Sequence, residues 1–318
     1  MAIGPVAVLE PASAEMRARI ETLCHGFDLR FVEGSAVDDF IRAVDGAEYV
    51  VTRGLRFPPE ALEAARALKL IHQWGTGTDG IPLDAARARG IQVARSPGMN
   101  APTVAEATLA LMLATLRQLP QVHNAFRAGQ WDMPDLWRQA RDLSACRVGL
   151  IGMGAIAQEV VIRLRGFGCP IAYTRASGPD AALDLQYLPL DELLANSDIV
   201  SLHLPLTDQT RHLMNTDAIA QLPQGSILIN TSRGGLVDET ALLTALERGH
   251  LAGAGLDVFE GEPVTRPGPL LSHPATVTLP HVAGRTLDNF DRMVRHWAGN
   301  IRKHATGAPI DPECIVLG

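Results

Sequence analysis

The amino-acid sequence predicts an α/β protein with doubly wound parallel sheets. Short apolar runs alternate with helical stretches along most of the chain, as parallel strands do when helices cover both faces of their sheet. A glycine-rich turn at residues 152–157 directly follows one apolar run and opens a helix, as at the start of a βαβ unit. With 318 residues, the chain is long enough for two domains of ordinary size.

Two series of strands are expected. In the first series, helical patterns at 57–68 and 82–90 separate β-rich runs at 5–10, 49–53, 68–74 and 91–96. The second series has runs at 146–152, 170–174, 198–205, 225–231, 251–259 and 275–281. Between the two series, residues 101–120 predict a buried connecting helix, which is too short and too interrupted to span a membrane.

The composition is that of a globular enzyme, with 47% apolar and 20% charged residues. The net charge of −7 argues against non-specific binding of nucleic acid. The first residues show no basic segment before an apolar run, so we expect no signal peptide and a cytoplasmic location. Scattered cysteines predict buried, reduced thiols, with neither disulfides nor a metal site; they are Cys24, Cys146, Cys169 and Cys314.

The glycine-rich turn reads Gly152-x-Gly154-x-x-Ala157. The first glycine permits a tight turn, the second lets a pyrophosphate approach the backbone, and the small third residue packs the helix on the sheet. Amides at the helix N-terminus then face the phosphates. We therefore expect a dinucleotide site here, and the alternative is a tight βα turn without a ligand.

Charged side chains follow three later strands, where open α/β sheets bind ligands: Arg233, Asp257 with Glu262, and His281. An arginine can fork onto a carboxylate and polarise a carbonyl. A histidine can supply a proton near neutral pH. A carboxylate bonded to the imidazole orients it and favours its protonated form. Hydride transfer to a 2-oxo acid requires this combination.

Several segments, in this order, resemble the D-isomer-specific 2-hydroxyacid dehydrogenase family, which includes phosphoglycerate, glyoxylate/hydroxypyruvate and D-lactate dehydrogenases. They are HQWGTGTDGI, VAEATLALMLATLR, GLIGMGAIAQ, SLHLPLTDQT, NTSRGGLVDETAL, GAGLDVFEGEP and PHVAGRT. The resemblance implies a Rossmann nucleotide-binding domain at 99–285, inserted in a flavodoxin-like substrate-binding domain of 1–98 plus 286–318. A cleft between them would hold the substrate, with hinges near 97–100 and 284–286.

The resemblance also implies catalytic roles. His281 would be the acid/base, Glu262 its partner, and Arg233 the anchor for the substrate carboxylate and carbonyl. Glu260 is the nearest rival to Glu262, and the spacing along the chain favours Glu262. A glutamate at this position argues against the related formate dehydrogenases, which carry glutamine there, whereas a phosphite-oxidising relative shares the set.

Two binding sets follow from the same resemblance. The backbone of Gly75, Thr76 and Gly77 would hold the substrate carboxylate, with Arg53 and Trp74 near that pocket. Asp257 would face the nicotinamide carboxamide. The residues expected to bind the cofactor are Gly152, Gly154, Ala155, Ile156, Thr174, Arg175, Pro205, Thr231 and Asp257.

Thr174 and Arg175 bear on which nucleotide is bound. Thr174 stands about twenty residues after the glycine-rich turn, where an NAD-binding chain places an acidic residue for the ribose. An acid would repel a 2′-phosphate, whereas Thr174 can donate a hydrogen bond and Arg175 can pair with the dianion. NADP(H)-using glyoxylate/hydroxypyruvate reductases resemble this segment. NADP(H) is therefore favoured; the alternative is that Arg175 faces solvent and NAD(H) is used as well.

Other polar residues have plainer interpretations. We expect His203 to support a strand end, and His72 to lie close to the substrate pocket without necessarily touching substrate. Asp79 and Glu106 are expected to hold loops or helix ends. Arg285 stands where many relatives carry a small residue, and we expect it on the surface, with contact to a second anionic group of the substrate as the alternative.

Trp131 and Trp137 lie between the predicted connecting helix and the glycine-rich turn. In the family this region resembles an arm that packs on a second subunit, so the resemblance implies a homodimer.

The expected activity is reduction of a small 2-oxo acid, with glyoxylate or hydroxypyruvate as the leading substrate. The first alternative is a phosphoglycerate or other D-2-hydroxyacid dehydrogenase; we expect no added regulatory domain of the kind some phosphoglycerate dehydrogenases carry, which weakens this alternative. The second is a nucleotide-sensing, co-repressor-like binding protein. The set of Arg233, Glu262 and His281 favours an enzyme.

Overall fold

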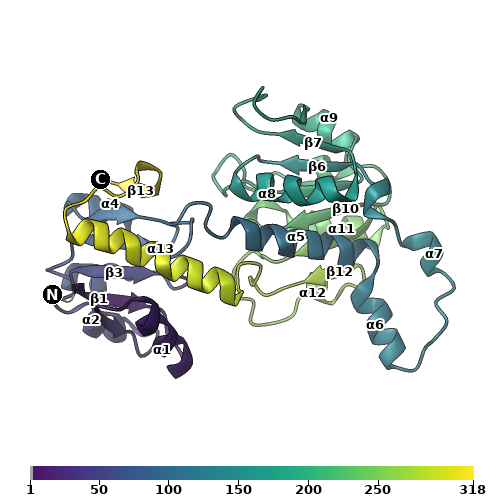
Figure 1. Ribbon diagram of the computed structural model, residues 1–318. Helices are drawn as coiled ribbons and strands as arrows, with labels where there is room; N and C mark the ends of the chain where they lie inside the picture. Colours follow the sequence, from purple (N-terminus) through teal and green to yellow (C-terminus); the bar gives the residue numbers. More distant parts are fainter. Residues whose placement is uncertain (1–2) are drawn as a thin grey trace. The chain divides into compact units, whose positions relative to one another are not determined.

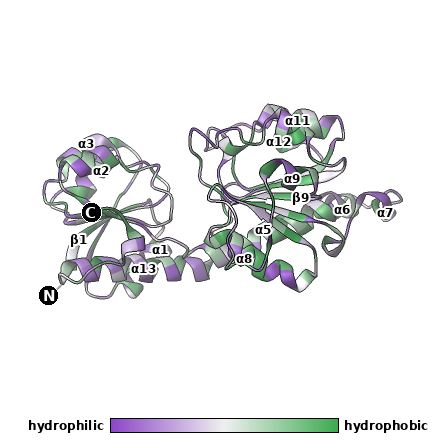
Figure 2. Ribbon diagram, turned by 90° about the horizontal axis from the view of Figure 1, so that it is seen from above, coloured by the Kyte–Doolittle hydropathy of each residue, from purple (hydrophilic) through white to green (hydrophobic). Residues whose placement is uncertain are grey.

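The computed structural model describes residues 3–318, and the chain forms two compact units (Figure 1). The first unit contains the chain up to Asn100 together with Thr286–Gly318, and the second contains Ala101–Arg285. Each unit is built around one sheet of its own. Figure 2 shows the strands inside each unit coloured largely as hydrophobic, as expected for buried strands.

The sheet of the first unit has the strand order β13-β5-β4-β3-β1-β2. Strands β1 to β5 are parallel and follow the flavodoxin-like order. Strand β13, which the sequence pattern did not predict, pairs antiparallel with β5 and forms one edge. The strands are β1 (Ile3–Leu9), β2 (Phe27–Phe31), β3 (Tyr49–Thr52), β4 (Leu70–Gln73), β5 (Gln92–Ala94) and β13 (Ile315–Leu317).

Helices cover both faces of this sheet. Side chains alternate along each strand, so Val50 joins a core cluster with Phe40 and Leu62, while Val51 joins another with Ile20 and Trp297. Helices α2, α3 and α4 therefore lie on one face, and α1 and α13 lie on the other. Their bounds are α1 (Ala14–Leu23), α2 (Val37–Val44), α3 (Pro59–Ala64), α4 (Leu83–Ala88), α13 (Leu287–Ala305) and the 3₁₀ turn η4 (Pro312–Cys314).

The sheet of the second unit is entirely parallel in the residues described, with the order β12-β11-β10-β9-β6-β7-β8. Strands β6 to β11 follow the Rossmann order, and β12 extends it by one strand. The predicted α/β fold class is thus confirmed. The strands are β6 (Val148–Ile151), β7 (Ile171–Thr174), β8 (Gln186–Tyr187), β9 (Ile199–Leu202), β10 (Ser226–Asn230), β11 (Leu251–Leu256) and β12 (Thr276–Thr278).

Helix α5 (Ala101–Leu116) packs closely on this sheet. A Cβ atom on Gly253 would lie 2.6 Å from Thr115 Cγ2, so β11 needs glycine where the helix passes over it. The helix ends earlier than the apolar pattern suggested, because Gln118 adopts a left-handed φ of 49°. The other helices are α6 (Leu119–Arg127), α7 (Leu136–Gln139), α8 (Ala155–Leu164), α9 (Leu190–Ala195), α10 (Thr216–Ala220), α11 (Glu239–Glu247) and α12 (Pro269–Ser272), with 3₁₀ turns η1 (Leu143–Ala145), η2 (Arg165–Phe167) and η3 (Gly234–Leu236).

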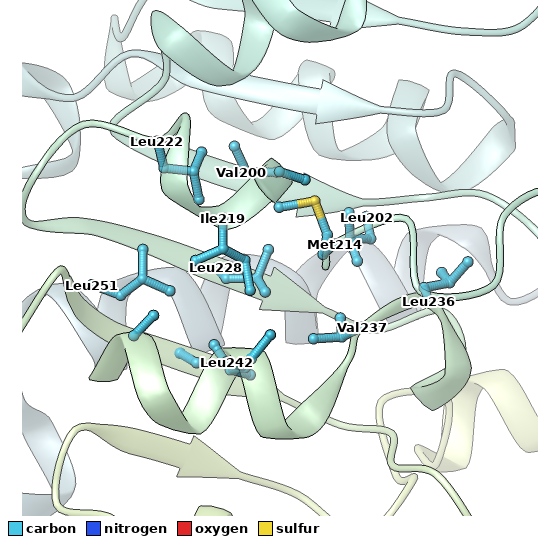
Figure 3. Packing of buried hydrophobic residues seen from close by; sticks show 14 of the residues in the cluster. Val200, Leu202, Met214, Ile219, Leu222, Leu228, Leu236, Val237, Leu242 and Leu251 are labelled. Carbon is cyan, nitrogen blue, oxygen red and sulfur yellow. The ribbon is translucent and has the colours of Figure 1, made fainter. Parts of the chain in front are cut away.

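One core cluster of the second unit fixes the segment that follows β10. Leu228 of β10, Leu242 of α11 and Met214 belong to this cluster (Figure 3). Leu236, the last residue of η3, and Val237, which comes next in the chain, are buried in the same cluster. Because these apolar side chains are anchored in the core, the polar residues just before them are held at the end of β10.

Helices α6 and α7 form an arm, residues 119–139, that extends away from the sheet of the second unit (Figure 1). Its large apolar side chains are exposed: Phe126 by 56%, Trp131 by 81% and Trp137 by 79%. Across residues 3–318, no helix combines the length and hydropathy needed to cross a membrane.

Candidate active site

The turn after β6 requires glycine at its first position. Gly152 has a φ of 94°, and a Cβ atom there would lie 2.2 Å from the carbonyl oxygen of His203. Its amide donates to the carbonyl of Thr174 at 2.9 Å. The turn therefore brings together the ends of β6, β7 and β9, at the point where the strand order reverses and α/β sheets bind ligands.

The second glycine of the turn is explained by the space around it, not by its backbone conformation. Gly154 is the N-cap of α8, and apart from its chain neighbours and the backbone of α8 itself no described atom lies within 4 Å of the place where its Cβ atom would stand. Among the described residues, no side chain caps this helix end, so the first amides of α8, including those of Ala155 and Ile156, keep their capacity to bind an anion. The turn thus fits the diphosphate of a dinucleotide.

Thr174 is the last residue of β7, and Arg175 follows it beside this turn. Thr174 is buried, with 7% of its surface exposed. Arg175 lies against its own loop: Nε donates to the carbonyl of Gly178 at 2.8 Å, and Nη1 lies 3.1 Å from Oδ2 of Asp180. The amide of Asp180 in turn donates to the hydroxyl of Tyr173 at 2.8 Å. The Arg175 guanidinium is therefore held at the end of β7, where it is paired with the carboxylate of Asp180.

A close approach between two loops places Arg233 near Glu262. A Cβ atom on Gly234 would lie 1.9 Å from the carbonyl carbon of Phe259, so only glycine lets the loop after β10 pass the loop after β11. Arg233 Nη1 donates to the carbonyl of Ser232 at 2.7 Å, which directs the side chain along this edge of the sheet.

Glu262 and His281 form a direct contact. Nδ1 of His281 lies 2.6 Å from Oε2 of Glu262, and Oε1 of the same carboxylate accepts the amide of Phe259 at 2.8 Å. Burial acts to raise the pKa of Glu262, but the hydrogen bonds from His281 and Phe259 and the charges of His281 and Arg233 lower it overall. Glu262 is therefore ionised at neutral pH.

Asp257 holds the loop that carries His281. Its two carboxylate oxygens accept the amides of Val282 and Ala283 at 2.7 and 2.9 Å, and its carbonyl accepts the amide of His281 at 2.7 Å. The residue is 1% exposed, and burial raises the pKa of its carboxyl. In the structure, Asp257 thus positions the histidine loop; a contact with nicotinamide stays a prediction.

A cavity of about 190 Å³ joins the three predicted catalytic side chains. It is lined by Leu206, Arg211, Arg233, Gly234, Gly235, Val258, Phe259, Glu260, Gly261, Glu262 and His281. A larger depression of about 450 Å³ lies beside β7 and β8 and contains none of the predicted site residues. The smaller cavity is the candidate active site, because of these two it alone contains a histidine–carboxylate pair, with an arginine beside it.

Glu260 faces a different partner from Glu262. Its Oε1 lies 3.2 Å from Nη1 of Arg211 and 3.0 Å from Nε2 of His212, and its amide donates to Oε1 of Glu239 at 2.7 Å. The structure therefore places Glu262, not Glu260, against His281. Sequence reasoning missed Arg211, His212 and Glu239; the signal available was the position of Arg211 and His212 shortly after the carboxyl end of β9.

The remaining residues of the predicted cofactor set lie at neighbouring strand ends. Pro205 is exposed after β9, and its carbonyl accepts the hydroxyl of Thr210. Thr231 follows β10 and shares a hydrogen bond of 2.9 Å with the hydroxyl of Thr108 on α5. His203 is buried and bonds to the hydroxyl of Ser201, in keeping with support of the strand end.

The predicted substrate residues lie in the first unit, after β3 and β4. Gly75, Thr76 and Gly77 follow β4 and are half-buried. Trp74 is 3% exposed and packs on Trp297, so its ring belongs to the core. The guanidinium of Arg53 lies over that ring, 5.3 Å from its centroid, and Nη1 lies 3.5 Å from Oε1 of Glu10. The ring of Trp74 thus forms a surface on which the guanidinium of Arg53 packs.

The residues given plainer interpretations are placed as follows. His72 is fully buried, and burial lowers its pKa to about 3, so it is a neutral core residue. Oε1 of Glu106 on α5 accepts from Nη2 of Arg163 on α8 at 3.2 Å, which joins two helices. Asp79 and Arg285 are exposed loop residues.

Comparison with known proteins places the chain in a family. Residues 109–283 match the family model described as "D-isomer specific 2-hydroxyacid dehydrogenase, NAD binding domain". A hydroxypyruvate reductase of Thermotoga maritima is 37% identical over 254 residues, which cover 79% of this chain and 82% of that protein. A D-3-phosphoglycerate dehydrogenase of Mycobacterium tuberculosis is 36% identical over 295 residues, 92% of this chain but 55% of that protein. The chain thus spans about half the length of this second relative.

A solved structure agrees along nearly the whole chain. The NADPH-dependent glyoxylate/hydroxypyruvate reductase of Sinorhizobium meliloti, in complex with citrate, has a TM-score of 0.84 and 30% sequence identity, and the match covers 97% of this chain and 98% of that one. This chain therefore belongs to the D-isomer specific 2-hydroxyacid dehydrogenase family, and it is an oxidoreductase that acts on a CH–OH group with a nicotinamide cofactor.

Proposed function

We propose that this chain reduces small 2-oxo acids to D-2-hydroxy acids, and that glyoxylate and hydroxypyruvate are its preferred substrates. One observation carries the proposal: the His281–Glu262 contact of 2.6 Å opens onto a cavity that Arg233 also lines. A proton donor, the carboxylate that orients it and a permanent cation for the substrate carboxylate are thus present in one cavity.

Each residue of the cavity has its own role in the proposed reaction. A bound nicotinamide supplies hydride to the carbonyl carbon of the substrate. Arg233 pairs with the substrate carboxylate and polarises the carbonyl. His281 gives a proton to the carbonyl oxygen through Nε2, because Nδ1 faces Glu262. Glu262 stays ionised, holds the ring in place and stabilises the imidazolium before the proton leaves.

The size of the cavity and the two reductases favour a small substrate. About 190 Å³ suits a 2-oxo acid of a few heavy atoms. The relative from Thermotoga maritima is named for hydroxypyruvate, and the structural relative for glyoxylate and hydroxypyruvate. The phosphoglycerate dehydrogenase extends well beyond the region this chain matches, so it supports that activity less directly.

For the substrate carboxylate, we assign a second binding segment in the first unit. The backbone amides of Gly75, Thr76 and Gly77 would receive it, with Arg53 beside them. Support for Arg53 comes from its contact with the buried ring of Trp74, which fixes the guanidinium. In this proposal the first unit contributes to substrate binding, and the second carries the catalytic side chains and the nucleotide site.

The proposed cofactor is NADP(H) in preference to NAD(H). No acidic side chain stands at Thr174, where an NAD-binding chain would bind the ribose hydroxyl. Arg175 lies directly after Thr174 and is held at the end of β7 by Gly178 and Asp180. A guanidinium in this place can pair with a 2′-phosphate, although Asp180 must then share it.

A homodimer in the cytoplasm completes the proposal. Trp131 and Trp137 are exposed on the arm, and large apolar side chains gathered in this way are typical of an interface. Cytoplasmic location is supported by the four cysteines, all of which are buried and free.

A panel of 2-oxo acids with each reduced nucleotide tests the proposal. Consumption of NADPH should be fastest with glyoxylate or hydroxypyruvate and slower with NADH. Nucleotide binding without turnover on any acid of the panel would refute the enzyme and would fit a nucleotide-sensing binding protein instead.

A further inference from the structure

Ser96 holds the Gly75–Thr76 segment through two hydrogen bonds. Its amide donates to the carbonyl of Gly75 at 2.9 Å, and its carbonyl accepts the hydroxyl of Thr76 at 3.2 Å. Ser96 follows β5 and has no exposed surface. The segment that we assign to the substrate carboxylate therefore takes its position from where Ser96 lies.

Helix α13 holds Ser96 in turn. Nδ1 of His296 lies 2.9 Å from the hydroxyl oxygen of Ser96, and Nε2 of the same ring lies 3.8 Å from Sγ of Cys314. Burial lowers the pKa of His296, so the ring is neutral at pH 7 and has one donor and one acceptor for these two partners.

One helical turn further along α13, Asn300 makes a second polar contact with the sheet. Its Nδ2 donates to Nε2 of His72 at 3.0 Å, and Nδ1 of His72 donates to the carbonyl of Gln73 at 2.8 Å. The side-chain Nε2 of Gln73 donates to the carbonyl of Arg53 at 3.1 Å. The same helix thus reaches both segments assigned to the substrate: His296 is linked to the Gly75–Thr76 segment, and Asn300 is linked to Arg53.

These polar contacts interrupt an apolar face. His296 and Asn300 are four residues apart and share one side of α13, which otherwise buries Val294, Trp297 and Ile301. Apolar residues of the same shape can replace a buried hydrogen-bonded pair with little loss of stability. A hydrogen bond, in contrast, fixes both distance and direction, so its value here lies in placing Ser96.

We propose that His296 is a positioning residue for substrate binding. Through Ser96 it sets where the amides of Gly75, Thr76 and Gly77 stand, and thereby the affinity for the carboxylate of the 2-oxo acid. This inference rests on the proposed function, since it takes that segment as the carboxylate site. Loss of the contact between His296 and Ser96 should therefore change the KM for the 2-oxo acid. It should leave the KM for NADPH unchanged, because the nucleotide site belongs to the second unit.

Two substitutions of His296 distinguish the contributions of its two ring nitrogens. Asparagine puts an amide near the position of Nδ1 and keeps the bond to Ser96, whereas glutamine reaches the position of Nε2 and loses that bond. The KM for glyoxylate should rise about tenfold in His296→Gln and in Ser96→Ala, and stay within about twofold of wild type in His296→Asn. The double variant His296→Gln/Ser96→Ala should be no worse than either single variant, because both break one contact.

Arg295→Gln is the matched control, because Arg295 lies next to His296 on the exposed side of α13. A glyoxylate KM that stays at the wild-type value in His296→Gln and Ser96→Ala would overturn the inference. An equal rise in the KM for glyoxylate and for NADPH, with a lower Tm, would overturn it as well, because that is a general loss of structure. If the wild type reduces no 2-oxo acid, the proposed function fails and this inference fails with it; wild-type turnover with unaltered variants refutes the inference alone.

Discussion

Nδ1 of His281 lies 2.6 Å from Oε2 of Glu262, in a loop whose backbone is held in an uncommon conformation. His281 has a φ of 53°, in the left-handed region that residues other than glycine seldom adopt. Contacts enforce it: the His281 amide donates to the carbonyl of Asp257, and the two following amides donate to its carboxylate. The loop therefore aims the imidazole at Glu262 before any substrate arrives.

Replacement of His281 by asparagine should remove turnover and spare nucleotide binding. Without a proton donor at this position, kcat should fall by about 10²- to 10⁴-fold. Nucleotide affinity, measured by fluorescence titration with NADPH, should stay within about twofold. His25→Asn, at an exposed position of the first unit, is the control. A large loss of NADPH affinity in His281→Asn would mean that this histidine is not the proton donor.

Acid should weaken the contribution of Glu262 to stability. The pKa of Glu262 is lower in the folded protein than its ordinary value of 4.5, so its ionised form stabilises the fold above pH 4.5. That contribution is lost as the pH falls through the folded pKa. Just above pH 4.5, the Tm of wild type should exceed that of Glu262→Gln. This difference in Tm should disappear as the pH falls through the folded pKa of Glu262.

Thermal unfolding followed by circular dichroism across this pH range measures the gap. Glu63→Gln, an exposed glutamate of α3, serves as the comparison and should show a much smaller gap. A Tm difference between wild type and Glu262→Gln that does not change with pH would contradict the lowered pKa of Glu262 in the folded protein.

Removal of the Arg175 guanidinium should discriminate between the two nucleotides. A charged hydrogen bond to a 2′-phosphate contributes about 1.5–3 kcal/mol, so Arg175→Ala should raise the KM for NADPH about tenfold or more. The KM for NADH should change less than about twofold. Arg165→Ala, on η2, is the control, since Arg165 faces Asp184. Equal changes for both nucleotides would sink the proposed NADP(H) preference.

Polar substitutions on the arm should dissociate the proposed homodimer. One chain has a mass of 34.1 kDa, so light scattering should give about twice that value for wild type. The double variant Trp131→Ser/Trp137→Ser should approach the mass of one chain, because it removes two large exposed apolar side chains. Ile162→Ser, an exposed apolar position on α8, should remain dimeric. A double variant that keeps the wild-type mass would place the interface elsewhere.

The sequence predicts the buried inner strands of this fold and misses three of its edge strands. β9 and β10 are mostly apolar and buried along their whole length, because helices cover both faces of their sheet. β2, β8 and β13 lie at or next to sheet edges, are short or only half-buried, and carry no comparable run. The antiparallel direction of β13 depends on where α13 returns the chain, which no local pattern records.

The sequence likewise predicts some features of the active site and misses others. Parallel strands end at one edge, so the sequence can gather Arg233, Glu262 and His281 in one region. Which side chains pair there depends on three-dimensional packing. The attachment of Arg175 to Asp180 required the structure. So did the burial of Trp74, which results from contact with residues of α13 that lie far away in the sequence.

Transfer of a labelled hydride tests the central proposal most directly. The enzyme would be incubated with hydroxypyruvate and NADPH carrying deuterium at both C4 positions of the nicotinamide, and the product examined by mass spectrometry and chiral chromatography. The account predicts D-glycerate with a single deuterium at C2, formed in equal amount to NADP⁺. Glycerate without deuterium at C2, glycerate of the L configuration, or no glycerate at all would contradict it.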